Sequence, residues 1–163
     1  MHTPPSSLVF RCCLVFLVLL LLGGCSGDPE KKKAVHYEKA MAYVQEKNPS
    51  AAIIELRNAI QVDPKYAEAR YQLGLLYLQA GEARNAFNEL QRAASLDPAN
   101  LDAKLKTAEF LLMGRDKDGA KKHVEEILVA KPEHVDALAL LATIHTADNK
   151  LDEAEEAIDK ALG

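Results

Sequence analysis

Tryptophan is absent from this sequence of 163 residues, and only 6% of the residues are aromatic. Glycine is scarce as well, with 8 residues. Strands are enriched in aromatic and β-branched side chains, so this composition favours helices over sheets. A positive surplus is missing too, because the formal net charge is −4 and lysine and arginine form no stripe along the chain. Without a basic surface to attract phosphates, nucleic acid is not expected as a partner.

Catalytic and metal-binding motifs are also missing: we find no Gly-rich phosphate loop, no nucleophile elbow and no zinc spacing. His123, His134 and His145 are spaced by eleven residues, which would align them on one helix, but Pro132 interrupts that helix. The segment Asp116–Gly119 resembles the start of a calcium loop but lacks the remaining oxygen ligands, so it is better explained as a turn. We therefore expect no enzymatic activity, no metal and no cofactor.

No apolar run is long enough to span a membrane, which takes about 20 residues in a helix. The run Leu14–Leu22 has nine residues; it follows the single charge of Arg11 and precedes two glycines and Cys25. This order is typical of a secretory signal.

The tetrapeptide Leu22-Gly23-Gly24-Cys25 resembles the lipobox of bacterial lipoproteins. The resemblance implies that residues 1–24 are a lipoprotein signal peptide and that Cys25 is the acylated anchor to the membrane. The alternative is an uncleaved or conventionally cleaved signal with an incidental cysteine. Ser26 stands where an inner-membrane retention signal would place Asp, which favours the outer membrane, facing the periplasm.

The mature chain then has no cysteine for a disulfide, because Cys12 and Cys13 leave with the signal and Cys25 carries lipid. Residues 25–33 form a short leader, in which Asp28 can cap a helix that begins at the next residue, a proline. The cluster Lys31–Lys33 faces either anionic headgroups or solvent.

A 34-residue period runs through the rest of the chain, carried by prolines and alanines inside apolar helical patterns. Each period holds two helical stretches joined by a short turn, so one repeat is a helical hairpin. Gly81 and Gly114 are expected to end first helices in the left-handed conformation, with Asn48-Pro49 and Asp148-Asn149 at the same place in the outer repeats. The markers of the period are Pro64, Pro98 and Pro132, and Ala52, Ala86, Ala120 and Ala154.

Within residues 67–100, small side chains at Gly74 and Ala86 allow the two helices to approach, and larger ones fill the seam. Leu73-Gly74, Tyr77, Ala86, Ala93 and Pro98, in this order, resemble the tetratricopeptide repeat (TPR). The resemblance implies an all-α fold, an α-solenoid of four helix-turn-helix hairpins with about eight helices. The expected repeats are 33–66, 67–100, 101–134 and 135–163.

The sequence stops at Gly163, directly after the second helix of the fourth repeat, without a polar capping helix. Leu151, Ile158 and Leu162 would then be partly uncovered. Either further repeats follow in a longer protein, or this face meets a partner or a second copy of the chain.

In TPR arrays the first helix of each hairpin lines a concave groove. Here the residues that the helical period places there are mostly apolar, with Glu68, Asp102, Glu109 and Asp136 among or beside them. They suit a partner peptide or helix with apolar anchors and basic flanks, or else they pack against later repeats. Glu89 and Arg92 are expected on the convex surface. The groove residues are Tyr37, Met41, Val44, Tyr71, Leu75, Leu78, Leu105, Leu112 and Met113.

These features predict a membrane-anchored scaffold of the bacterial cell envelope that binds protein partners, in envelope assembly, export or exopolysaccharide secretion. The leader and first two repeats look most like TPR lipoproteins of exosortase (PEP-CTERM) systems, and next like pilotin-type lipoproteins that help secretin rings assemble. A chaperone-like carrier of unfolded clients and an accessory subunit of a membrane enzyme are the alternatives.

Overall fold

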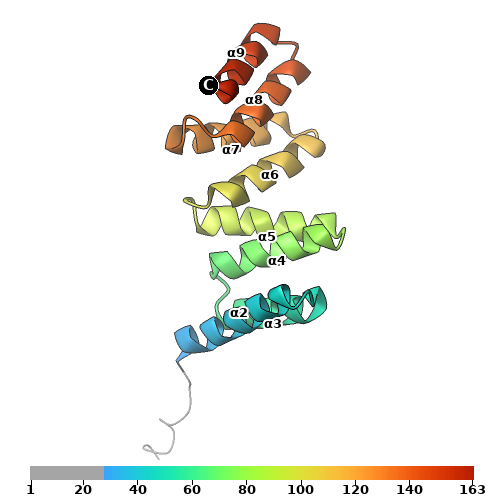
Figure 1. Cartoon of the computed structure of the whole chain (residues 1–163), viewed down its shortest axis with the longest axis vertical. Helices are drawn as coiled ribbons and strands as arrows, with labels where there is room; N and C mark the ends of the chain where they lie inside the picture. Colours follow the sequence, from blue (N-terminus) through green and yellow to red (C-terminus); the bar gives the residue numbers. More distant parts are fainter. Residues whose placement is uncertain (1–27) are drawn as a thin grey trace, which may run out of the picture.

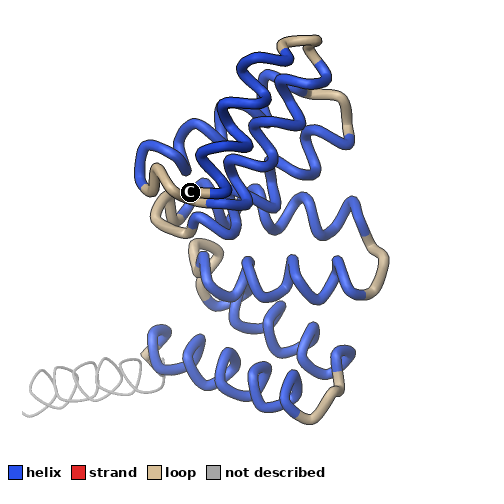
Figure 2. Tube along the Cα trace, turned by 45° about the horizontal axis from the view of Figure 1, so that its top comes forward, coloured by secondary structure: helices blue, strands red, loops and turns tan. Residues whose placement is uncertain are grey.

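The computed structural model describes residues 28–163, which form eight helices and no strand (Figures 1 and 2). The helices pair into four antiparallel hairpins, so the predicted all-α solenoid is confirmed. The proposed signal peptide and Cys25 lie outside the described residues. The helices are α2 (Pro29–Gln45), α3 (Pro49–Val62), α4 (Ala67–Gln79), α5 (Ala83–Leu96), α6 (Leu101–Met113), α7 (Lys117–Ala130), α8 (Val135–Ala147) and α9 (Leu151–Leu162).

The four hairpins are stacked in chain order along the long axis of the molecule, from α2 and α3 at one end to α8 and α9 at the other (Figure 1). The second helix of each hairpin packs on the first helix of the next, as α3 does on α4 and α5 on α6. No described helix is long and apolar enough to cross a membrane. Each hairpin thus buries its apolar faces against its neighbours, as expected for a solenoid.

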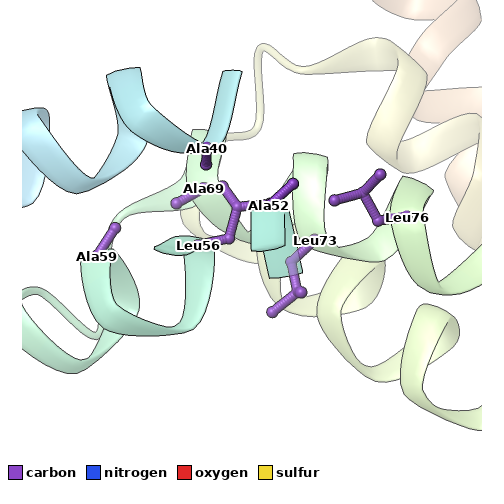
Figure 3. Packing of buried hydrophobic residues seen from close by; sticks show 7 residues of the cluster. All are labelled: Ala40, Ala52, Leu56, Ala59, Ala69, Leu73 and Leu76. Carbon is purple, nitrogen blue, oxygen red and sulfur yellow. The ribbon is translucent and has the colours of Figure 1, made fainter. Parts of the chain in front are cut away.

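Small side chains lie where the helices approach most closely. All four periodic alanines are buried, and Ala52 packs with Ala40 and Leu56 between α2 and α3 (Figure 3). In the second hairpin, a Cβ atom added at Gly74 would lie 2.7 Å from Cγ of Leu90, closer than such atoms approach in proteins. The close approach predicted at Gly74 is confirmed, because only a hydrogen fits against Leu90.

Side chains of the residue before the helix cap several helix starts. Asp28 accepts a hydrogen bond from the backbone N–H of Glu30, which confirms the cap predicted before Pro29. Asp116 caps α7 by accepting from the backbone N–H of Gly119 at 2.9 Å. The segment that resembles a calcium loop is therefore a turn and the first turn of a helix.

The left-handed residue of each hairpin turn keeps the 34-residue period, although the type of residue at that position changes. The left-handed residues are Lys47, Gly81, Arg115 and Asn149, with φ of 56°, 74°, 66° and 58°, and consecutive ones are 34 apart. The prediction for Gly114 is wrong, because its φ is −75°. Stacking fixes the turn geometry at one position of the repeat, and Arg115 adopts the left-handed conformation there although a glycine precedes it.

A polar side-chain pair links the two helices of each of the first three hairpins, and it is an ion pair in the second and third. His36 contacts Glu55 at 2.6 Å, Arg70 contacts Glu89 at 2.5 Å and Lys104 contacts Glu126 at 2.8 Å. The first two pairs join equivalent positions of the repeat. In the fourth hairpin, these positions hold Leu138 and Ala157, which are both buried.

Glu89, which is expected on the convex surface, is not free there but pairs with Arg70. Arg70 is only 5% exposed, and the side chain of Glu89 is 20% exposed. Arg70 also donates from Nε and Nη2 to the carbonyl oxygen of Pro64, at 2.9 and 2.7 Å. Glu89 therefore neutralises a buried charge.

Lys33 is tied down as well, so only part of the lysine cluster is free to face headgroups or solvent. Its Nζ atom contacts Asp63 at 2.6 Å and Glu30 at 2.8 Å, and lies 5.0 Å from the ring centroid of Tyr66. These contacts fix the start of α2 to the turn between α3 and α4. Lys31 and Lys32 remain exposed.

We expect the melting temperature to fall when the pH drops below about 4.5. The hydrogen bond from His36 lowers the pKa of Glu55, and the hydrogen bond from Lys33 lowers the pKa of Asp63. A carboxyl whose pKa is lower in the folded than in the unfolded protein stabilises the fold above the unfolded pKa. That contribution is lost as the pH falls through the folded pKa. Thermal unfolding followed by circular dichroism between pH 7 and 3 measures the melting temperature. Asp63→Asn should lose less of its melting temperature over this range than the unmodified protein. An identical decrease in the variant would show that Asp63 does not contribute.

Candidate functional site

The nine predicted groove residues lie on the first helices of the first three hairpins, and we call them the inner strip. Met113 is 70% exposed, Leu78 40% and Val44 39%. Five members are half-buried: Tyr37, Met41, Tyr71, Leu75 and Leu112. An apolar surface therefore runs along α2, α4 and α6.

Leu105 is the exception in the inner strip. It is only 5% exposed and belongs to the core, where it packs with Ala108, Val124 and Ala137. The reason is that α8 packs on α6 as well as on α7, and so covers this part of α6. Leu105 holds the third and fourth hairpins together and offers little surface to a partner.

Glu68 connects the first two hairpins at the edge of the inner strip. The hydroxyl of Tyr37 donates to its Oε1 atom at 3.1 Å, and Nε2 of Gln72 donates to the same atom at 3.1 Å. Partial burial and the nearby Glu68 carboxylate raise the pKa of Tyr37. The phenol therefore stays protonated at neutral pH and acts as a donor to the carboxylate.

A hollow of about 540 Å³ lies beside Tyr71, where α4 and α6 begin. Burial, and then the charges of Asp102 and Glu68, raise the pKa of Tyr71. The aromatic ring thus lies among carboxylates, an arrangement that suits a cationic side chain with an apolar stem. The hollow is lined by Glu68, Tyr71, Asp97, Ala99, Asn100, Leu101, Asp102, Lys131 and His134.

The loop residues of this hollow are not among the predicted site residues. Asp97 and Lys131 are 34 apart, as are Asn100 and His134, so each pair occupies one position of the repeat. Asn100 accepts from the backbone N–H of Ala103 at 2.8 Å and caps α6. The repeat period could have placed these residues side by side at consecutive turns. The helical period could not have identified these residues, because it applies only within helices and these residues lie in the turns.

The three histidines do not converge. His134 caps α8, with its Nδ1 atom 3.3 Å from the backbone N of Ala137. The Nδ1 atoms of His123 and His145 are buried without a hydrogen-bond partner, and burial lowers the pKa of His123. Within residues 28–163, no three His, Cys, Asp or Glu side chains are placed to hold a metal ion.

Several solved structures have this fold. A crystal structure of MamA is 26% identical, with a TM-score of 0.71 over 80% of this chain and 76% of that one. YrrB, described as a TPR protein with an unusual peptide-binding site, is 21% identical, with a TM-score of 0.69 over 80% and 67% of the two chains. PilF of Pseudomonas aeruginosa is 22% identical, with a TM-score of 0.65 over 82% and 61%. The last two similarities show the fold alone.

No curated protein matches the sequence. A family model does match, over residues 30–162, which include nearly all of the described solenoid. The model is that of the cytochrome c-type biogenesis protein H TPR domain. TPR domains are protein interaction scaffolds, which agrees with a half-exposed apolar strip beside carboxylates. The chain therefore belongs to the family of the cytochrome c-type biogenesis protein H TPR domain.

Proposed function

We propose that this protein is a lipid-anchored scaffold of the bacterial cell envelope, which holds a segment of a partner protein on its inner strip. The observation that carries the proposal is the composition of the strip: exposed or half-exposed apolar side chains on three successive first helices, with Glu68 and Asp102 beside Tyr71. Contiguous exposed apolar side chains mark interaction surfaces, whereas single ones do not.

The partner segment should carry apolar anchors and basic flanks. Tyr71 and Leu75 lie one helical turn apart on α4 and offer a partly exposed apolar surface. The carboxylates of Glu68 and Asp102 line the adjacent hollow and favour lysine or arginine beside the anchor. A helix or an extended peptide of this composition would bury its apolar side chains on the strip.

Two features of the sequence support a place in the envelope. The lipobox-like tetrapeptide ending in Cys25 supports lipid anchoring, and Ser26 supports the periplasmic face of the outer membrane. The resemblance of the leader and first two repeats to exosortase-system lipoproteins supports a role in exopolysaccharide secretion. The matching family is named for a biogenesis protein, which supports a role in assembly.

A carrier of unfolded clients is the second candidate, because Met41 and Met113 lie in the strip and methionine adapts to many partners. A competition experiment distinguishes a carrier of unfolded clients from a scaffold with a dedicated partner. A generic hydrophobic peptide should displace the clients of a carrier, whereas it should leave a dedicated partner bound.

The double substitution Tyr71→Ala and Leu75→Ala should weaken partner capture from the native envelope about thirtyfold, because truncating a central aromatic anchor commonly costs about 2 kcal/mol or more. Full-length protein would be used, with circular dichroism to verify the helical fold. Gln91→Ala, at an exposed position of α5, is the matched control and should capture normally. Normal capture by the double variant would refute the proposed site.

A further inference from the structure

A second groove lies between α3 and α5, with α4 as its floor, and we call it the outer groove. Its volume is about 640 Å³. From α4 it uses Arg70, Leu73 and Tyr77, a different face from that of Tyr71 and Leu75. The residues that line it are Arg57, Ile60, Gln61, Pro64, Arg70, Leu73, Tyr77, Asn85, Asn88, Glu89 and Arg92.

The outer groove is cationic in a chain with a formal net charge of −4. Its lining includes three arginines and one carboxylate, Glu89. That carboxylate is engaged by Arg70 at 2.5 Å. Arg57 and Arg92 are exposed, and neither has an ion pair within the described part of the chain. Two guanidinium groups, with five donors each, are thus available at the groove.

The same groove recurs between the third and fourth hairpins, with a volume of about 370 Å³. Each residue that lines it is 68 positions, or two repeats, after a residue of the outer groove. The hollow itself is therefore a product of repeat stacking. The residues of this later groove are Leu128, Pro132, Leu138, Leu141, His145, Glu153, Glu156, Ala157 and Lys160.

The chemistry of the two grooves differs although their geometry is equivalent. Asn85 and Asn88 of the outer groove correspond to Glu153 and Glu156 of the later one. Arg92 corresponds to Lys160, whose charge is taken up by Glu156 at 2.6 Å. The fold is thus compatible with either an amide or an acidic lining at these two positions. In the outer groove the amides leave Arg92 without the carboxylate that pairs with Lys160 in the later one.

We propose that the outer groove docks an acidic segment of a partner protein. Carboxylates of that segment pair with Arg57 and Arg92, which can each bind a carboxylate through two parallel hydrogen bonds. An apolar side chain of the segment packs against Ile60 and Tyr77 between them. The exposed amide of Asn88 can bond the backbone of an extended peptide.

The charge of this groove differs from that of the hollow beside Tyr71 on the inner strip, whose lining holds three carboxylates against one lysine. The scaffold can then distinguish two partner segments by charge, one on each side of α4. This inference rests on Arg57 and Arg92 and is independent of the function proposed for the inner strip.

The test uses full-length protein in detergent and a fluorescein-labelled peptide, DELEDLEE, with KKLKKLKK as its basic counterpart. The acidic peptide should bind and the basic one should not. Arg57→Gln combined with Arg92→Gln should weaken binding of the acidic peptide at least tenfold and reduce its salt dependence. Lys160→Gln, in the equivalent later groove, should leave binding unchanged, and so should Tyr71→Ala with Leu75→Ala.

Equal affinity of the double arginine variant for DELEDLEE would overturn the proposal. Complete displacement of DELEDLEE by inorganic phosphate, at a concentration on the order of the dissociation constant of the peptide, would also overturn it, because the groove would then be a small-anion site. A third arm uses the peptide LDEAEEAIDKALG, residues 151–163 of this chain. Tighter binding of that peptide than of DELEDLEE would overturn the assignment to a partner in favour of a second copy.

Discussion

Replacing Glu89 by alanine is expected to lower the free energy of unfolding by about 3 kcal/mol. Arg70 is 5% exposed and pairs with Glu89 at 2.5 Å, so the substitution leaves a buried guanidinium without its counter-ion. The carbonyl of Pro64 still accepts two hydrogen bonds from Arg70 but carries no charge to balance it. Denaturant unfolding, followed by circular dichroism, measures the effect.

The fourth hairpin provides a matched control for this pair, since Leu138 and Ala157 occupy the positions of Arg70 and Glu89. Arg70→Leu combined with Glu89→Ala recreates this apolar pair and should recover most of the lost stability, because no charge remains buried. Gln91→Ala, at an exposed site, should change stability by less than about 0.5 kcal/mol. An effect of Glu89→Ala as small as that would show that the ion pair does not support the fold.

The repeat period predicts most of this fold because the same packing requirement recurs in every hairpin. Every 34 residues the same small side chain must fit between two helices, and Ala52, Ala86 and Ala120 are buried accordingly. The glycine at position 74 allows the closest approach, to Leu90. These constraints act within one hairpin, so they are readable from one sequence without knowledge of the neighbours.

The turns show where residue type is a weaker guide than the period. Gly114 is the residue that local propensity selects for a left-handed cap, yet Arg115 holds that conformation, with φ of 66°. Arg115 lies 34 residues after Gly81, so the spacing of the turns identifies it correctly. The geometry of the stack outweighs the cost of a left-handed arginine, which is on the order of 1 kcal/mol.

The candidate site is predictable only in part. The helical period selects the side of α2, α4 and α6 that carries the inner strip, and eight of its nine residues keep some exposure. It cannot show that α8 covers Leu105, which depends on how neighbouring hairpins pack. It also misses the outer groove, which requires α3 and α5 to lie on either side of α4.

The side-chain pairs between the two helices of a hairpin are also predictable only once the helix packing is known. His36 and Arg70 occupy one position of the repeat and Glu55 and Glu89 another, so the pairing has a period of 34. The two members of each pair are 19 residues apart in the chain. They can be recognised as partners only when it is known which residues of the two antiparallel helices lie opposite each other. Treating Glu89 as an isolated surface residue overlooks the partner that the register places beside it.

Replacing Cys25 by serine is expected to abolish labelling with a fatty acid and to release the protein from the membrane fraction, if Cys25 is the lipid anchor proposed above. Each buried methylene of an acyl chain contributes about 0.8 kcal/mol, so two or three chains hold a protein stably. The lysines at the end of the leader cannot replace them. Lys33 is engaged by Asp63 and Glu30, and the exposed Lys31 and Lys32 contribute only about 1 kcal/mol each at an anionic surface. Cys13→Ser, within the proposed signal peptide, should keep both labelling and membrane association, whereas unchanged labelling of the Cys25 variant would show that the anchor lies elsewhere.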